Sequence, residues 1–165
     1  MFGFGQLIGI LKKNPKKIVF TEGEDPRILE ASSRLLASYF LHPILIGDEK
    51  RIADAAEESG FNIRGAEIID PEKFDKIDEM VELYCELRKK KGVTPDQARE
   101  ILKQANYFGT MLVKMGFADA LLGGATYSTA DTVRPALQLI KTKPGNNLVS
   151  SCFILVRPSA TGDNE

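Results

Sequence analysis

Three stretches of the sequence place an arginine beside residues that bind anions. The first, TEGEDPR, puts Arg27 at the expected start of a helix, where backbone N–H groups and the helix dipole favour an anion. A guanidinium adds two directed donors there. The alternative is a surface arginine whose charge is offset by Glu24 and Asp25. The residues leave both interpretations open.

The second stretch, LLGGATYSTADTVRP, is the better candidate for an anion-binding loop. It offers the backbone of Gly123 and Gly124, the hydroxyls of Thr126 and Ser128, and Arg134 one turn further on. Its glycine spacing matches neither the Rossmann fingerprint nor the Walker A motif. The alternative is a strand-to-helix turn capped by Ser and Thr.

The third stretch, ELRKKKG, gathers positive charge at the expected end of a helix. The helix dipole alone accounts for the lysines at 89–91, which we interpret as solvated. Arg88 is left open between this explanation and an anion contact.

Other reactive residue types are scarce, with one histidine and two cysteines in the chain. His42 precedes a proline at the expected entrance of a strand, and we interpret it as structural. Cys85 and Cys152 fall in apolar segments without metal-ligand spacing, so we expect two buried thiols and no metal site. The carboxylates of Glu22, Glu24 and Asp25 could include a general base, but we expect them to be solvated caps of a turn.

Length and composition fit one α/β domain over 1–165. The chain is 43% hydrophobic and 27% charged, which is enough apolar material for a single core. A net charge of -1 gives no reason to expect nucleic acid as a partner. No apolar run approaches the roughly 18 residues that cross a bilayer, and MFGFGQLIGILKK reads as an amphipathic helix, not a secretory signal. We therefore expect a cytoplasmic protein without a membrane contact.

Apolar runs alternate with helical patterns, which predicts an open, mostly parallel sheet of about five strands. Ligands of such sheets bind beyond the carboxyl ends of the strands, where the loops at 22–27 and 123–129 would lie. The expected strands cover 18–21, 43–47, 66–70, the region around Leu121, and 148–156. The expected helices cover 25–39, 48–60, 71–92 and 94–116, the last with a break near Asn106. Val133, Leu137 and Ile140 mark a further helix that stops before Pro144, and Pro135 should kink or shorten its first turns.

Longer stretches resemble one known family. FTEGEDPRILEA, ELRKKKGVTPDQARE and the segment of about forty residues that begins YFGTMLVKMGFADALLGG resemble the phosphate acetyltransferases of the phosphate acetyl/butyryl transferase family. The resemblance implies the exchange of an acyl group between coenzyme A and inorganic phosphate, with no metal in the chemical step and coenzyme A as a substrate, not a bound cofactor. It also implies helices on both faces of the sheet, as in the first domain of the isocitrate/isopropylmalate dehydrogenase-like fold of this family.

The resemblance carries roles onto three arginines. It associates Arg88 with coenzyme A, places Arg134 in the active site as the catalytic residue, and places Arg27 near the substrates. The residues that would line the cleft with backbone and hydroxyl donors are Gly123, Gly124, Thr126 and Ser128.

Family members also have a second half, whose aspartate is a proposed base for the thiol of coenzyme A. We therefore expect this chain to correspond to an N-terminal half, with apolar surface near 148–156 that favours a homodimer or self-association. The alternatives are a non-catalytic domain that binds coenzyme A or an acyl phosphate, an interaction module, and butyryl in place of acetyl transfer.

Overall fold

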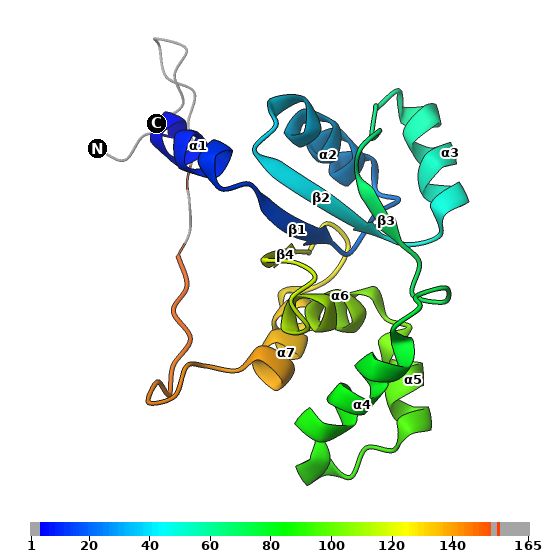
Figure 1. The fold of residues 1–165 in the computed structure, drawn as a ribbon, viewed down its shortest axis with the longest axis vertical. Helices are drawn as coiled ribbons and strands as arrows, with labels where there is room; N and C mark the ends of the chain where they lie inside the picture. The colour runs from blue at the N-terminus through cyan, green and yellow to red at the C-terminus, as the bar shows by residue number, and fades with distance from the viewer. Residues whose placement is uncertain (1–3, 153–154, 156–165) are drawn as a thin grey trace.

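Four short parallel strands form one open sheet in the computed structural model, which describes residues 4–152 and residue 155 (Figure 1). The strand order is β3-β2-β1-β4. β1 (Lys16–Phe20) pairs with β2 (Leu41–Ile46) on one side and with β4 (Ala120–Leu122) on the other, and β3 (Glu67–Ile69) forms the edge beyond β2. The prediction of an open parallel α/β sheet is confirmed.

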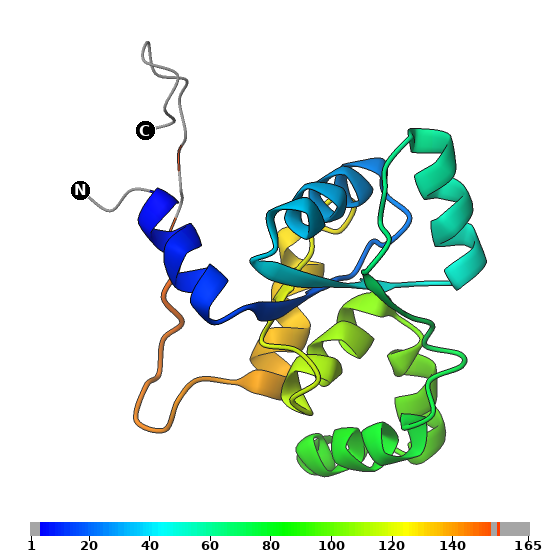
Figure 2. The same ribbon diagram turned by 45° about the horizontal axis from the view of Figure 1, so that its top comes forward.

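Helices cover both faces of this sheet (Figure 2). Along the chain they are α1 (Phe4–Lys13), α2 (Pro26–Ser38), α3 (Glu49–Ser59), α4 (Ile77–Leu87), the 3₁₀ turn η1 (Lys89–Lys91), α5 (Pro95–Leu102), α6 (Ala105–Lys114), α7 (Thr129–Pro135) and the π-helical η2 (Ala136–Ile140). Among the described residues, no helix combines the length and the hydropathy that a membrane span requires.

Successive residues of β1 and β2 face opposite sides of the sheet, so each strand contributes to two cores. Phe20 and Leu45 belong to the core under α2 and α3. Val19 and Ile44 belong to the larger core on the other face, with side chains of α4, α5, α6 and η2. The central strands are buried on both faces, which explains their unbroken apolar runs.

Three of the predicted helix starts are confirmed by their caps. The carboxylates of Asp25 and Asp48 accept the backbone N–H groups of Arg27 and Arg51, each within the first turn. Thr94 and Gln97 form a reciprocal capping box at the start of α5. The helix predicted from residue 71 is corrected: α4 begins at Ile77. Asp70 accepts the N–H of Glu72 through its side chain at 2.9 Å, and the resulting turn replaces the first expected helical turns.

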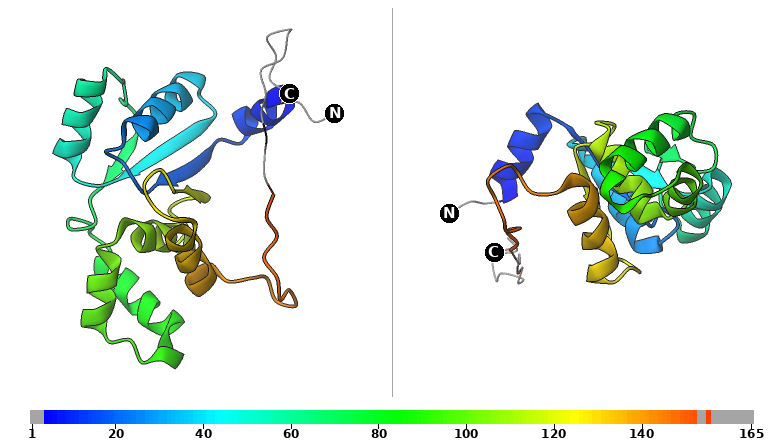
Figure 3. Two further views of the ribbon diagram at one scale, coloured as in Figure 1. Left: turned by 180° about the vertical axis from the view of Figure 1, so that it is seen from behind. Right: turned by 90° about the horizontal axis from the view of Figure 1, so that it is seen from below.

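The predicted strand at 148–156 is wrong for the part that the structure describes. Residues 148–152 pair with no strand, and Leu148 and Val149 are 84% and 61% exposed. Residues 148–152 run away from the sheet, where no described strand offers backbone partners (Figures 1 and 3). Cys152, expected within this strand, is therefore exposed. Phe153, Ile154 and the residues from 156 onward lie outside the described part.

Pro135 ends α7 and changes the helix type. Since proline has no N–H to donate, the helix continues with wider turns through η2, where the N–H of Lys141 donates to the carbonyl of Ala136 at 3.0 Å. The predicted kink thus takes the form of a π-helical segment.

The loop after β1 makes a close approach to β2 at Gly23. A Cβ built on Gly23 would lie 2.7 Å from the carbonyl oxygen of Ile46 and 2.9 Å from Cδ1 of Ile52. Since the first of these atoms belongs to the backbone of a buried strand, the loop has room only for glycine at this position.

We predict that Gly23→Ala lowers the free energy of unfolding by about 1–3 kcal/mol, because β2 or the loop must move to admit the methyl group. Gly9→Ala in α1 is the matched control, since no atom lies within 4 Å of its Cβ and alanine favours a helix. Urea unfolding of the two variants measures the difference. Equal effects would contradict a close approach at Gly23.

Candidate functional site

The loops that follow β1 and β4 meet at the carboxyl-end edge of the sheet. Phe20 and Leu122 are paired in the sheet, so the two chain segments leave it side by side. Thr21 and Glu22 follow β1, and the loop 123–128 follows β4 and leads into α7. This convergence brings together two stretches that the sequence singled out separately.

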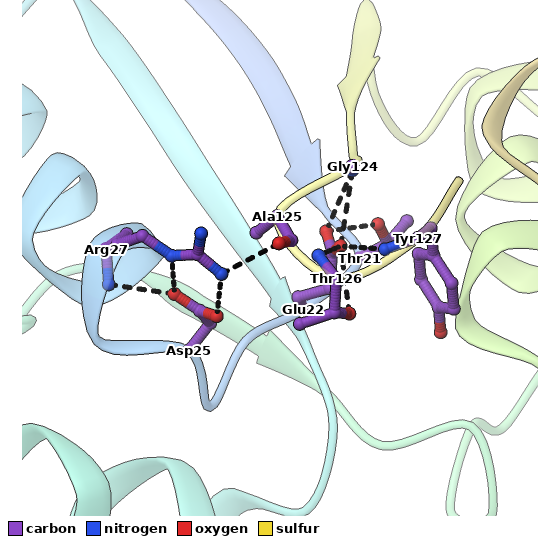
Figure 4. Close-up of polar contacts among 8 residues, drawn as sticks. All are labelled: Thr21, Glu22, Asp25, Arg27, Gly124, Ala125, Thr126 and Tyr127. Carbon is purple, nitrogen blue, oxygen red and sulfur yellow. Dashed lines mark hydrogen bonds and ion pairs between the residues drawn. The ribbon is translucent and has the colours of Figure 1, made fainter. Parts of the chain in front are cut away.

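The carboxylate of Glu22 is the centre of this junction (Figure 4). It accepts the backbone N–H of Thr126 at 2.7 Å, that of Gly124 at 3.2 Å and that of Tyr127 at 3.3 Å. The hydroxyls of Thr126 and Thr21 donate to it at 3.2 and 3.0 Å. Glu22 is only 9% exposed, so the prediction of a solvated carboxylate is wrong for this residue.

Hydrogen bonding sets the charge state of Glu22. Burial alone would raise its pKa, but the donors of Thr126, Thr21, Tyr127 and Gly124 together outweigh burial and hold the pKa below its ordinary value. The 123–128 loop therefore does bind an anion with its backbone, and in this structure the anion is the protein's own carboxylate.

Two glycines let the loop close around Glu22. A Cβ on Gly123 would lie 2.7 Å from Oγ1 of Thr21, and Gly124 adopts a φ of 111°, which side chains rarely tolerate. Ser128 ends the loop as the N-cap of α7, where its hydroxyl accepts the N–H of Asp131 at 3.2 Å and donates to that residue's carboxylate at 2.7 Å. For Ser128, the alternative of a capped strand-to-helix turn is thus confirmed.

Arg27 reaches across to the same loop. Nε and Nη2 donate to the carboxylate of Asp25 at 2.9 and 2.7 Å. Nη2 also donates to the carbonyl of Ala125 at 2.7 Å (Figure 4). The side chain is 67% exposed, and Nη1 has no hydrogen-bond partner among the described residues. Arg27 is therefore both charge-balanced by Asp25 and able to offer one end of its guanidinium to an anion.

Arg88 and Arg134 line one cleft of about 370 Å³ between the α4–α5 hairpin and α7. Nε of Arg88 is buried and has no hydrogen-bond partner within the described part of the chain. Nη1 of Arg134 lies 4.0 Å from the carboxylate of Asp131. The other side chains at the cleft are Tyr84, Val93, Ile101, Gln104, Asn106, Tyr107 and Gln138.

A larger cleft of about 760 Å³ runs along the carboxyl ends of β1, β2 and β3. Its basic residues, which no sequence motif marked as candidates, are Arg51, Lys73 and Lys103. Arg51 pairs with Glu24 at 2.7 Å and Lys73 with Asp70 at 2.7 Å. Asp70-Pro71 after β3 repeats the Asp25-Pro26 pattern after β1. From this repetition one could have predicted that both strand ends line one cleft.

The remaining candidates lie elsewhere. His42 is exposed near the start of β2, at the edge of the sheet opposite the loops. Cys85 is partly buried and packs against the larger core, as predicted. Glu24 and Asp25 are engaged by Arg51 and Arg27. Within residues 4–152, no group of three His, Cys, Asp or Glu side chains could hold a metal ion.

The family described as phosphate acetyl/butaryl transferase matches residues 4–163. The chain belongs to this family. It is similar to phosphate acetyltransferases of Bacillus subtilis, at 50% identity over 86% of this chain and 43% of the relative, and of Thermoanaerobacterium thermosaccharolyticum, at 46% identity over 93% and 46%. The chain therefore spans less than half the length of these relatives.

Solved structures of two phosphotransacetylases show the same fold. A phosphotransacetylase from Staphylococcus aureus matches with a TM-score of 0.78 and 44% identity, over 88% of this chain and 45% of that one. One from Streptococcus pyogenes matches with a TM-score of 0.78 and 43% identity, over 87% and 45%.

We predict that Glu22→Gln lowers the free energy of unfolding at pH 7 by about 2 kcal/mol, because the amide turns an N–H group toward donors that need an acceptor. A lowered pKa means that ionised Glu22 stabilises the fold above its ordinary pKa of 4.5, and that this contribution disappears as the pH falls through the folded-state value. The gap between wild type and variant should therefore narrow below about pH 4.5. Urea unfolding across pH measures it, with the exposed Glu57→Gln as control, and a gap independent of pH would contradict the argument.

Proposed function

We propose that this chain supplies one part of a site for acyl transfer between coenzyme A and inorganic phosphate, with acetyl phosphate and free coenzyme A as the products from acetyl-CoA. The observation that carries the proposal is the shared cleft of Arg88 and Arg134, in a chain of the phosphate acetyl/butyryl transferase family. Both substrates carry phosphate groups, and two guanidiniums at one cleft suit anions that would otherwise repel each other. The proposed setting is the cytoplasm.

In the direction that forms acetyl-CoA, the thiolate of coenzyme A attacks the carbonyl carbon of acetyl phosphate. A carbon–sulfur bond forms, the carbonyl oxygen becomes an oxyanion, and the carbon–oxygen bond to phosphate then breaks. We assign Arg134 to the charge that develops on the oxyanion and the leaving phosphate. Arg88 would hold a phosphate of coenzyme A, and Nη1 of Arg27 would approach the acyl phosphate.

The thiol must lose a proton before it attacks, and the carboxylates near the loops are already engaged. Glu22 accepts from the 123–128 loop, Asp25 from Arg27, and Glu24 pairs with Arg51. A carboxylate that already accepts hydrogen bonds or pairs with an arginine is poorly placed to take a proton from the thiol. We therefore propose that the base comes from a second half of the kind that longer family members have.

We predict that Arg88→Ala weakens coenzyme A binding to this chain by about 10- to 100-fold, the loss of one charge-assisted contact of roughly 1.5–3 kcal/mol. Lys90→Ala is the matched control, because Lys90 is exposed on the neighbouring turn. Calorimetric titration with coenzyme A measures both variants. Equal and small effects would mean that the basic cluster attracts anions only in a general way.

We predict that the 165-residue chain alone shows little acyl transfer and gains activity when mixed with a separately expressed second half of a close relative. The measurement is acetyl-CoA formation at constant protein concentration. In the active mixture, Arg134→Lys should lower turnover, since lysine keeps the charge but cannot give two directed donors to phosphate. Coenzyme A binding without turnover in every mixture would favour a binding domain, and no binding at all would favour an interaction module.

A further inference from the structure

Glu22 binds the loop that contacts Arg27 and that leads into α7, the helix of Arg134. Ala125, whose carbonyl accepts from Arg27 at 2.7 Å, lies between Gly124 and Thr126, whose N–H groups donate to Glu22. The direction of the Ala125 carbonyl is therefore fixed from both sides. Tyr127, the next donor to Glu22, directly precedes the N-cap of α7.

We propose that Glu22 is a positioning residue: it acts as an internal anion that fixes the 123–128 loop, and through the Ala125 carbonyl it holds Arg27 in the orientation that receives a phosphate. The inference rests on the proposed function for the identity of that phosphate, and it deepens the role of this site. Both oxygens of Glu22 already accept hydrogen bonds, from the loop and from Thr21, so the proposed role acts through Arg27 and not through a contact of Glu22 with the substrate.

Three features of the geometry support a positioning role over plain stabilisation. The loop directs the N–H groups of Gly124, Thr126 and Tyr127 at one carboxylate, an arrangement that binds anions and is unfavourable when empty. Asp25 accepts from the Nε and Nη2 edge of Arg27, which leaves Nη1 free, and the bond from Nη2 to the carbonyl of Ala125 gives the guanidinium a second fixed contact (Figure 4). The carbonyl of Ala125 lies 98 positions from Arg27 in the chain, so this bond joins the guanidinium to the loop after β4, whereas Asp25 joins it only to the start of its own helix.

Chemical rescue tests the proposal on the chain itself. Glu22→Ala removes the internal anion and leaves the N–H groups unpaired, so added acetate should bind in its place. We expect the amide NMR signals of Gly124, Thr126 and Tyr127, and the Nε–H signal of Arg27, to move in Glu22→Ala and to return toward their wild-type positions with saturating acetate. Wild type and the exposed Glu57→Ala should show no such response. If Glu22→Ala does not fold, Glu22→Gln provides the comparison of Arg27 signals.

An Arg27 signal that is the same in wild type and in the Glu22 variant would overturn the proposal, whatever the activity of the protein. This readout needs no turnover, so its result is independent of whether the proposed function holds.

Kinetics in the mixture with a second half give the functional readout. Glu22→Gln should raise the KM for acetyl phosphate by about tenfold, as expected for one lost charge-assisted contact at Arg27. In an Arg27→Ala background, it should raise KM no further, because the residue through which it acts is gone. A defect in folding alone would lower the amount of active protein and leave KM unchanged.

The two proposals fail in different ways. If Arg27→Ala leaves KM unchanged, the role of Arg27 in the proposed function is wrong. If Arg27→Ala raises KM and Glu22→Gln does not, Arg27 binds the substrate and the positioning role of Glu22 is wrong.

Discussion

A buried carboxylate surrounded by five donor groups organises the carboxyl-end edge of this sheet. Glu22 follows the central strand, and four of its five donors belong to the loop after β4, up to 105 positions later in the chain. Because a charge at 9% exposure is stable only when it is fully hydrogen-bonded, the loop and the strand end must keep one relative position. Gly123 and Gly124 permit the close approach, and Ser128 converts the end of the loop into a helix start.

The other constraints of the site build on this junction. The 123–128 loop delivers α7 and its Arg134, while the side chain of Asn106 at the start of α6 donates to the carbonyl of Asp131 at 2.9 Å. α7 is thus fixed both from the sheet and from α6. The position of Arg88 does not depend on the 123–128 loop, because Arg88 lies at the end of α4, on a hairpin that packs against the larger core. The two arginines of the cleft therefore depend on different parts of the fold.

The sequence predicted best the features that neighbouring residues determine. Asp25-Pro26 and the Thr94–Gln97 box start helices because cap and acceptor lie within one turn. It predicted worst the features that depend on distant partners. Glu22 looked solvated, because none of its backbone donors is near it in the chain. The apolar run from Leu148 looked like a strand, but a strand also needs a free edge beside it. The joint cleft of Arg88 and Arg134 requires the fold of the α4–α5 hairpin, which no local pattern describes.

The separate attachment of that hairpin has a thermodynamic consequence. Interactions that keep the α4–α5 hairpin close to α7 raise the affinity for any molecule that contacts both Arg88 and Arg134. By linkage, the binding of such a molecule stabilises the same interactions. Packing residues of α4 and α5 that never touch the molecule, such as the buried Met80 and Leu102, therefore contribute to its affinity.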